Sequence, residues 1–169
     1  MEKQLLAFLA KHGIAHLRFD HPPVYTCEEA SRIIPGLPGA ETKNLFLKAG
    51  NSGRYLLAAV PAEARVDLKA LAATVGCKNL GFASAERLRE TLGLEAGSVT
   101  LLAAFCDVDA KVDVLIDAEL VEADAVLCHP LVNTATLALP TAELLRFLAL
   151  TRHPPRILPV PRKLDAPAD

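Results

Sequence analysis

The sequence predicts a single α/β domain of the α+β type, in which helices flank a mixed and largely antiparallel β-sheet. Its 169 residues correspond to about one domain, and 51% are hydrophobic against 22% charged, the balance of a chain with a buried core. Helical patterns and short apolar runs are interspersed, and two of the runs form a hairpin. This order does not follow a regular series of parallel β-α-β units.

The first expected elements are a helix, a strand and a rigid connection. Residues 2–12 carry leucines at helical spacing and end at a glycine. Residues 14–19 alternate apolar and polar side chains, which is typical of a half-buried strand. Pro22 and Pro23 then impose an extended connection, because proline fixes φ and disfavours helix at the residue before it.

A second helix and a hairpin come next. Thr26 and Glu29 match a capping box, which predicts a helix that runs to about Ile34. A loop rich in glycine and proline ends it. The apolar segments 44–49 and 55–60 follow, joined by Gly-Asn-Ser-Gly, and this is the clearest β-hairpin in the chain.

Two further helices have signals at both ends. Asp67 precedes a periodic apolar segment that closes at Gly76, and Ser84 precedes another that closes at Gly93. Residues 78–82 are expected to form a short strand between them.

The rest of the chain is richer in β-structure. We expect strands in four apolar runs, at 99–105, 112–116, 125–128 and 134–139, and a last helix over 142–150. Residues 1–151 are assigned to the domain. Residues 152–169 contain five of the twelve prolines, so we expect an extended C-terminal tail and no second domain there.

Charge and composition exclude several classes of function. The net charge of −2 argues against indiscriminate coating of nucleic acid, although a local basic patch could still bind one end of a tRNA. The chain lacks a run of about 18 apolar residues and a secretory leader, so we expect a cytoplasmic protein that spans no membrane. The four cysteines stand apart, without a Cys-x-x-Cys pair, which favours reduced thiols over a zinc site.

Three segments could carry chemistry. In Glu-Thr-Lys-Asn-Leu-Phe-Leu, at 41–47, a lysine and an amide lie at the start of a strand. In Gly-Leu-Glu-Ala-Gly-Ser-Val-Thr, at 93–100, glycines allow the backbone to approach a ligand. In Cys-His-Pro-Leu-Val-Asn-Thr-Ala-Thr, at 128–136, a histidine could order a water molecule. Each segment alone also fits a solvated lysine, an ordinary helix stop or a structural histidine.

Together, in this order, the three segments resemble the YbaK/ProX family of aminoacyl-tRNA editing domains. His-Pro-Pro-Val-Tyr-Thr at 21–26 is similar to the family's opening segment, and the resemblance spans about residues 1–150. The free-standing ProX (PrdX) branch, related to the editing insertion of prolyl-tRNA synthetase, is the most similar. One position departs from the pattern, since Leu101 stands where the family's glycine loop commonly has proline.

The resemblance implies an editing-domain fold and a trans-editing deacylase that removes alanine from mischarged tRNA(Pro). Lys43 would hold the terminal phosphate or ribose, and Asn44 and His129 would orient substrate or water. The amino acid would meet the glycine loop and two threonines, through Gly97, Ser98, Val99, Thr100, Thr134 and Thr136. No cofactor or metal is implied. The expected partners are the tRNA acceptor end, met by scattered cations such as Lys48, Lys78 and Arg87, and prolyl-tRNA synthetase.

Three alternatives remain open at this point. The chain could be a deacylase for cysteine, serine or threonine, which only the dimensions of the pocket would distinguish. It could be a non-catalytic module that binds tRNA or docks on a synthetase, and such a module would not need Lys43. It could also bind a small metabolite, if the cavity is closed to a CCA end.

Overall fold

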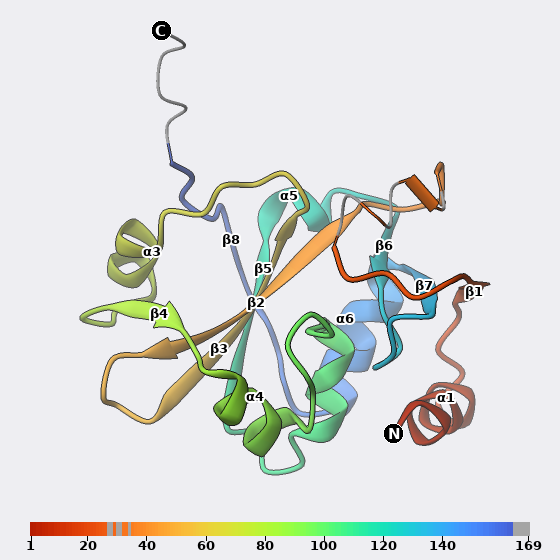
Figure 1. Ribbon diagram of the computed structural model, residues 1–169, viewed down its shortest axis with the longest axis horizontal. Helices are drawn as coiled ribbons and strands as arrows, with labels where there is room; N and C mark the ends of the chain where they lie inside the picture. Colours follow the sequence, from red (N-terminus) through yellow and green to blue (C-terminus); the bar gives the residue numbers. More distant parts are fainter. Residues whose placement is uncertain (27–28, 30–31, 34, 164–169) are drawn as a thin grey trace, which may run out of the picture.

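The structure is a computed structural model that describes residues 1–26, 29, 32–33 and 35–163 (Figure 1). The described residues form a five-stranded sheet of order β4-β2-β3-β5-β8 and a three-stranded sheet of order β1-β7-β6. The strands are β1 Leu17–Asp20, β2 Thr42–Ala49, β3 Arg54–Pro61, β4 Leu80–Phe82, β5 Val112–Asp117, β6 Ala125–Cys128, β7 Ala135–Pro140 and β8 Arg156–Leu158. The helices are α1 Glu2–Lys11, α3 Leu68–Val75, α4 Ala85–Leu92, the 3₁₀ helix η1 Leu101–Cys106, α5 Ala118–Val121 and α6 Thr141–Leu150.

The pairing confirms a mixed, largely antiparallel arrangement. In the larger sheet β4, β2 and β3 are antiparallel neighbours, whereas β5 runs parallel to both β3 and β8. The smaller sheet is antiparallel throughout. Helices lie on both sides of the larger sheet, with α3 on one side and α6 on the other (Figure 1).

The β2–β3 hairpin forms as predicted, with Ala49 opposite Arg54 across the turn. Gly50 has a φ of +51°, and a Cβ at this position would lie 2.6 Å from the Asn79 side-chain oxygen. A side chain would therefore meet both a disfavoured backbone conformation and a steric clash. The turn fixes the register that sets Lys43 opposite Val60 at the far end of the hairpin.

The predicted helix caps are also confirmed. The Asp67 carboxylate accepts hydrogen bonds from the amides of Lys69 and Ala70, and the Ser84 hydroxyl accepts one from the amide of Arg87. Both helices end at a left-handed glycine, as expected for α3 and α4.

The strand predicted at 99–105 is wrong, because residues 101–106 form the 3₁₀ helix η1. The Thr100 hydroxyl accepts a hydrogen bond from the amide of Leu102 and caps this helix. A short apolar run has no periodicity that separates a strand from a buried helical turn. The four-residue helix α5 was not predicted.

The expected helix over 26–34 lies partly outside the described residues. The Thr26 hydroxyl accepts a hydrogen bond of 3.1 Å from the Glu29 amide, as in a capping box. Glu29, Arg32 and Ile33 are helical.

Two hydrophobic clusters lie on opposite faces of the larger sheet, and β3 contributes to both. Leu57 and Ala59 belong to the cluster that contains α1, η1 and α6, while Leu56, Ala58 and Val60 belong to the cluster beneath α3. The alternation follows from the two-residue period of a strand. It leaves β3 buried on both faces, so the hairpin is held rigidly from its centre.

The proline-rich segment contributes an edge strand. Residues 156–158, expected to be extended, form β8 and pair parallel to β5. Val160 is buried in the cluster beneath α3, and Val66 pairs with Arg162 in an antiparallel bridge. The segment up to Lys163 therefore packs on the same sheet as the residues before it.

A buried polar pair joins the end of α6 to the start of β5. The Nε2 atom of His153 lies 3.0 Å from the Asp107 carboxylate, and the side chains are 1% and 4% exposed. The same carboxylate oxygen accepts a 2.7 Å hydrogen bond from the Val112 amide. Asp107 thus satisfies two polar groups in the interior.

None of the described helices is long and apolar enough to cross a membrane. Cys77, Cys106 and Cys128 are free thiols, in agreement with the expectation of reduced cysteines, whereas Cys27 lies outside the described residues.

Candidate active site

A pocket of about 160 Å³ opens at the start of β2 and brings four distant parts of the chain together. Its lining comes from the opening segment, β2, the glycine loop and the segment after β6: Val24, Tyr25, Thr26, Thr42, Lys43, Asn44, Gly97, Val99 and His129. Five of the nine predicted site residues, Lys43, Asn44, Gly97, Val99 and His129, are in this lining. It includes no carboxylate from the described residues.

Lys43 and Asn44 occupy successive positions of β2, so their side chains leave opposite faces of the strand. The Oδ1 atom of Asn44 is buried and has no hydrogen-bond partner among the described residues. A buried amide oxygen without a donor is costly, and native proteins rarely keep one without a ligand or water. Asn44 therefore offers an acceptor to a bound molecule.

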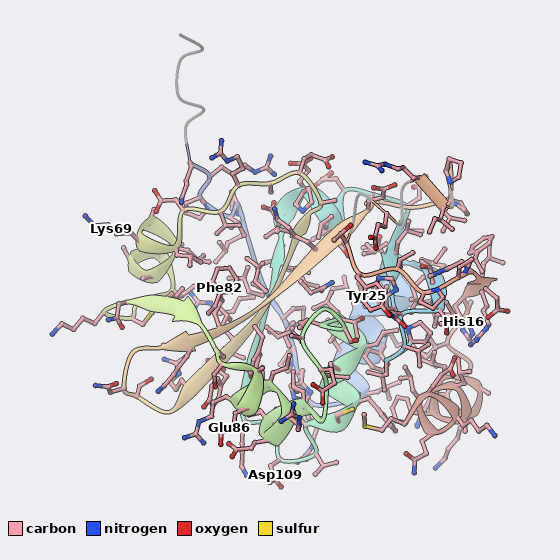
Figure 2. The ribbon with its side chains drawn as sticks, in the orientation of Figure 1. His16, Tyr25, Lys69, Phe82, Glu86 and Asp109 are labelled. Carbon is pink, nitrogen blue, oxygen red and sulfur yellow. The ribbon has the colours of Figure 1, made fainter. Side chains whose placement is uncertain are left out.

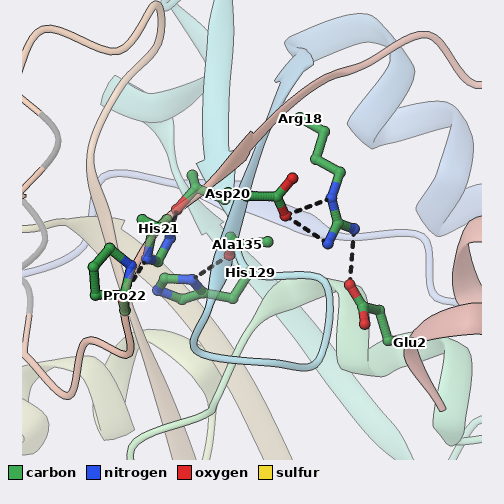
Figure 3. A network of polar contacts seen from close by, with 8 residues as sticks. Glu2, Arg18, Asp20, His21, Pro22, His129 and Ala135 are labelled. Carbon is green, nitrogen blue, oxygen red and sulfur yellow. Dashed lines mark hydrogen bonds and ion pairs between the residues drawn. The ribbon is translucent and has the colours of Figure 1, made fainter.

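His129 presents a neutral ring to the pocket. Its Nδ1 atom lies 3.1 Å from the carbonyl oxygen of Ala135 and must donate, because a carbonyl only accepts (Figure 3). Burial lowers the pKa of His129, the bond to Ala135 raises it, and the neighbouring His21 lowers it. The burial effect is the largest, so the ring stays neutral near pH 7, with Nε2 as an acceptor.

His21 lies beside His129, with ring centroids 6.4 Å apart in an edge-on arrangement. Its Nδ1 atom donates to the carbonyl oxygen of Pro22 at 2.8 Å, and its Nε2 atom is hydrogen-bonded to the Thr136 hydroxyl at 3.0 Å. Thr136 is buried behind this ring and does not line the pocket. The Thr136 hydroxyl therefore orients the His21 ring. From the sequence we expected Thr136 to contact the substrate.

The opening segment is held against the smaller sheet. The amides of His21 and Val24 donate to the carbonyl oxygens of Thr134 and Asn133, at 3.0 Å each. Thr134 itself is exposed and outside the pocket lining. Upstream of His21, Arg18 pairs with Glu2 and Asp20, which ties β1 to α1 (Figure 3).

The glycine loop contributes its backbone and one side chain. Gly97 has a φ of +89°, a conformation that favours glycine, and it lines the pocket with Val99. Ser98 and Thr100 are absent from the lining, and Thr100 is fully buried as the cap of η1. Leu101, in the position of the family's proline, is fully buried in the core. The Thr100 cap and the buried Leu101 side chain hold this loop in place of a proline ring.

Val24, Tyr25, Thr26 and Thr42 are lining residues that the sequence did not single out. The signal for the first three was the motif at 21–26, which we had used only to support the resemblance. Tyr25 lines the pocket and is 69% exposed, so its ring is accessible to a bound molecule.

Among the described residues, neither Cys128 nor a cluster of metal-binding side chains adds reactive chemistry to the pocket. Burial raises the pKa of Cys128 to about 12, which keeps its thiol protonated and unreactive. Among the described residues, no group of three or more histidine, cysteine or acidic side chains could hold a metal ion. The pocket instead offers one cation, one amide acceptor, one neutral imidazole and a glycine backbone, which can bind a polar ester and orient water.

The proteins to which this chain is similar agree with the chemistry that these pocket groups allow. Residues 21–147 match the aminoacyl-tRNA editing domain family. A zebrafish (Danio rerio) protein named prolyl-tRNA synthetase associated domain-containing protein 1 is 38% identical over 160 residues, which cover 94% of this chain and 86% of the relative. The prolyl-tRNA editing protein ProX of Acetoanaerobium sticklandii is 33% identical over 143 residues, covering 85% and 87%.

Solved structures share the fold. The crystal structure of a candidate trans-editing enzyme for prolyl tRNA synthetase superposes with a TM-score of 0.73 at 21% identity, over 96% of this chain and 97% of that one. The match of most of the chain and the two relatives confirm the resemblance read from the motifs. The chain therefore belongs to the aminoacyl-tRNA editing domain family, in the YbaK/ProX group.

Proposed function

We propose that this protein is a trans-editing deacylase that hydrolyses the ester of alanyl-tRNA(Pro). The observation that carries the proposal is the pocket in which Lys43, the unpartnered Asn44 oxygen and the neutral His129 ring come together. The name of the ProX relative, a prolyl-tRNA editing protein, supports tRNA(Pro) as the substrate.

The residues suggest how the ester is held. The Lys43 ammonium group binds the terminal phosphate or ribose and fixes the CCA end beside Asn44 and His129. The Asn44 oxygen accepts a hydrogen bond from the α-ammonium group or from water. The Nε2 atom of His129 accepts from the attacking water or from the vicinal 2′-hydroxyl.

Hydrolysis then needs little from the protein beyond positioning. The water oxygen bonds to the ester carbonyl carbon, the bond from that carbon to the ribose 3′ oxygen breaks, and the leaving oxygen takes a proton. Because the ester is already activated, orientation of water and substrate supplies most of the acceleration. The 2′-hydroxyl can relay the proton, which accounts for a lining without a carboxylate.

Selection for alanine follows from size. A small pocket excludes larger side chains by steric overlap, whereas the loss of one methylene contact discriminates by only about 1–3 kcal/mol. Gly97 and Val99 border the space that an amino-acid side chain would enter. Cysteine and serine are the nearest competitors, since each adds only one atom to alanine.

The proposal is tested by deacylation assays of the purified chain with Ala-tRNA(Pro), Cys-tRNA(Pro) and Ser-tRNA(Thr). We expect fastest hydrolysis of Ala-tRNA(Pro). Faster hydrolysis of another substrate would change the amino acid that the protein is proposed to remove, but the protein would still be a deacylase. Binding of tRNA or of prolyl-tRNA synthetase with no hydrolysis of any substrate would favour a non-catalytic module, a role suggested by the name of the zebrafish relative.

The state of His129 predicts an acid limb in the pH profile. Protonation adds a hydrogen to Nε2 and removes the acceptor, so the rate should fall as the pH decreases through the pKa of this ring. Because burial lowers that pKa, the fall is expected only below 6.5, the ordinary value for histidine. His129→Gln keeps an acceptor near the Nε2 position that does not titrate, and its profile should lack this limb.

The measurement is the deacylation rate between about pH 5 and 8, corrected for spontaneous hydrolysis. His21→Gln serves as a matched control, since His21 stands beside His129 but outside the pocket lining. An acid limb that persists in His129→Gln and disappears in His21→Gln would assign the titration to the wrong ring.

A further inference from the structure

A second hollow, of about 490 Å³, lies on the other face of β2 between β4 and α3. We call it the basic groove, lined by Lys43, Leu45, Ala64, Arg65, Val66, Asp67, Leu68, Lys69, Phe82 and Lys163. Lys43 belongs to the lining of both the groove and the active-site pocket. Lys43 is therefore common to the two hollows.

The groove concentrates positive charge in a protein whose net charge is −2. Four of its described lining residues are cationic, whereas Asp67 is the one carboxylate among them. Lys43, Lys69 and Lys163 make no ion pair with any described residue, although Arg54, Arg87 and Arg89 elsewhere each pair with an acidic side chain. Three lysines without an acidic partner among the described residues favour an anionic ligand.

Three separate segments build this charge. Lys69 lies in the first turn of α3, and Lys163 is brought to the groove by the C-terminal segment. The amide of Lys163 donates to the carbonyl oxygen of Arg65 at 2.7 Å, and the amide of Asp67 donates to that of Pro161 at 2.9 Å. The proline-rich segment thus forms one wall of the groove.

An exposed aromatic ring completes the groove. Phe82 ends the edge strand β4 and is 69% exposed, on the same side of the molecule as Lys69 (Figure 2). Phosphate-binding cations beside an exposed ring are the two components of single-stranded nucleic acid sites, where bases stack on aromatic side chains. An acidic peptide would use the cations but leave the ring without a partner of matching shape.

We infer that the basic groove binds the single-stranded nucleotides that lead to the aminoacylated 3′ adenosine. Lys69 and Lys163 contact phosphates, Phe82 stacks on a base, and the strand reaches the pocket at Lys43. This inference rests on the proposed function for its direction, because the ester must lie in the pocket. From the sequence we instead expected Lys48, Lys78 and Arg87 as tRNA contacts. None of these three residues lines the groove.

The test compares a full tRNA with a minimal ester. For Lys69→Gln/Lys163→Gln and for Phe82→Ala we expect KM for Ala-tRNA(Pro) to rise about tenfold, since each stacking or phosphate contact carries a comparable share of binding. The ratio of kcat/KM for Ala-tRNA(Pro) to kcat/KM for 3′-O-alanyl-adenosine should fall by a similar factor. Lys3→Gln/Lys11→Gln, which removes two exposed lysines of α1, is the matched control.

Direct binding gives a second readout that does not depend on catalysis. For an uncharged oligonucleotide ending in CCA, the slope of log affinity against log salt should fall by about 1.4 in the double lysine variant, or about 0.7 for each phosphate contact. Asp67→Asn removes the one carboxylate while keeping a good helix cap, and should tighten binding.

The outcomes separate the two proposals. Wild-type protein that binds the oligonucleotide through the groove but hydrolyses no aminoacyl-tRNA would refute the deacylase and retain the groove. If the groove variants and the α1 control hydrolyse Ala-tRNA(Pro) with the same KM and show the same salt slope, the inference that the groove binds the 3′ nucleotides would be overturned. If the groove variants lose binding to polyglutamate but still bind the oligonucleotide, the groove serves an acidic protein partner. That result would also overturn the proposal that it binds single-stranded nucleotides.

Discussion

Replacing Lys43 with alanine is expected to lower kcat/KM for Ala-tRNA(Pro) by about 100-fold or more, the usual effect of removing one preorganised charge from a reacting site. Lys43 is the one cation among the described residues of the pocket lining, and it also lines the basic groove. Its loss would remove both the anchor for the CCA end and the positive charge near the ester. Single-turnover deacylation with saturating enzyme measures the effect on the hydrolytic step.

Lys48→Ala is the matched control, because Lys48 lies five positions further along the same strand and outside the pocket. Lys43→Arg keeps the charge but changes its geometry, so we expect an intermediate rate. If Lys43→Ala and Lys48→Ala hydrolyse every aminoacyl-tRNA at the same rate, Lys43 has no role in the active site.

The largest expected effect on stability comes from Asp107. Asp107→Ala removes the carboxylate that His153 and the amide of Val112 share, and both polar groups would stay buried without it. Each buried polar group left without its hydrogen-bond partner costs about 1–3 kcal/mol, because it has lost water as well as its contact, and this substitution leaves two such groups. The free energy of unfolding in urea, extrapolated to zero denaturant, measures this loss.

Asp109→Ala provides the comparison, since Asp109 lies two residues away and pairs with Lys111 on the surface. This variant removes the same charge from the same loop but leaves no buried donor without an acceptor. It should lower the free energy of unfolding far less than Asp107→Ala. Equal losses in the two variants would show that the buried pair contributes no more than a surface contact.

Local signals predicted much of the fold, because their causes are local. The hairpin depends on a four-residue turn, and the α3 and α4 caps depend on Asp67, Ser84 and the glycines that follow each helix. The apolar run at 99–105 failed because its residues are buried in either conformation, so composition could not decide between strand and 3₁₀ helix. The Thr100 hydroxyl, which caps that helix, was taken for a substrate contact.

The candidate site was predicted only where motifs marked it. Lys43, Asn44 and His129 were named from segments that meet in the pocket, but their meeting depends on pairing between strands far apart in sequence. Thr136 was expected to line the pocket, and the structure places it under His21, a position that depends on the pairing of β1 with β7. The basic groove was missed because Lys69, Lys163 and Phe82 belong to three elements with no shared motif.

The position of β8 also bears on how the chain folds during synthesis. β8 is the last of the described strands to leave the ribosome, yet it covers the edge of β5, and Val160, two residues after it, joins the apolar cluster beneath α3. Until it emerges, β5 presents an unpaired row of amides and carbonyls to other nascent chains. The larger sheet therefore closes only after β8 has emerged, and until then the nascent domain is most exposed to aggregation.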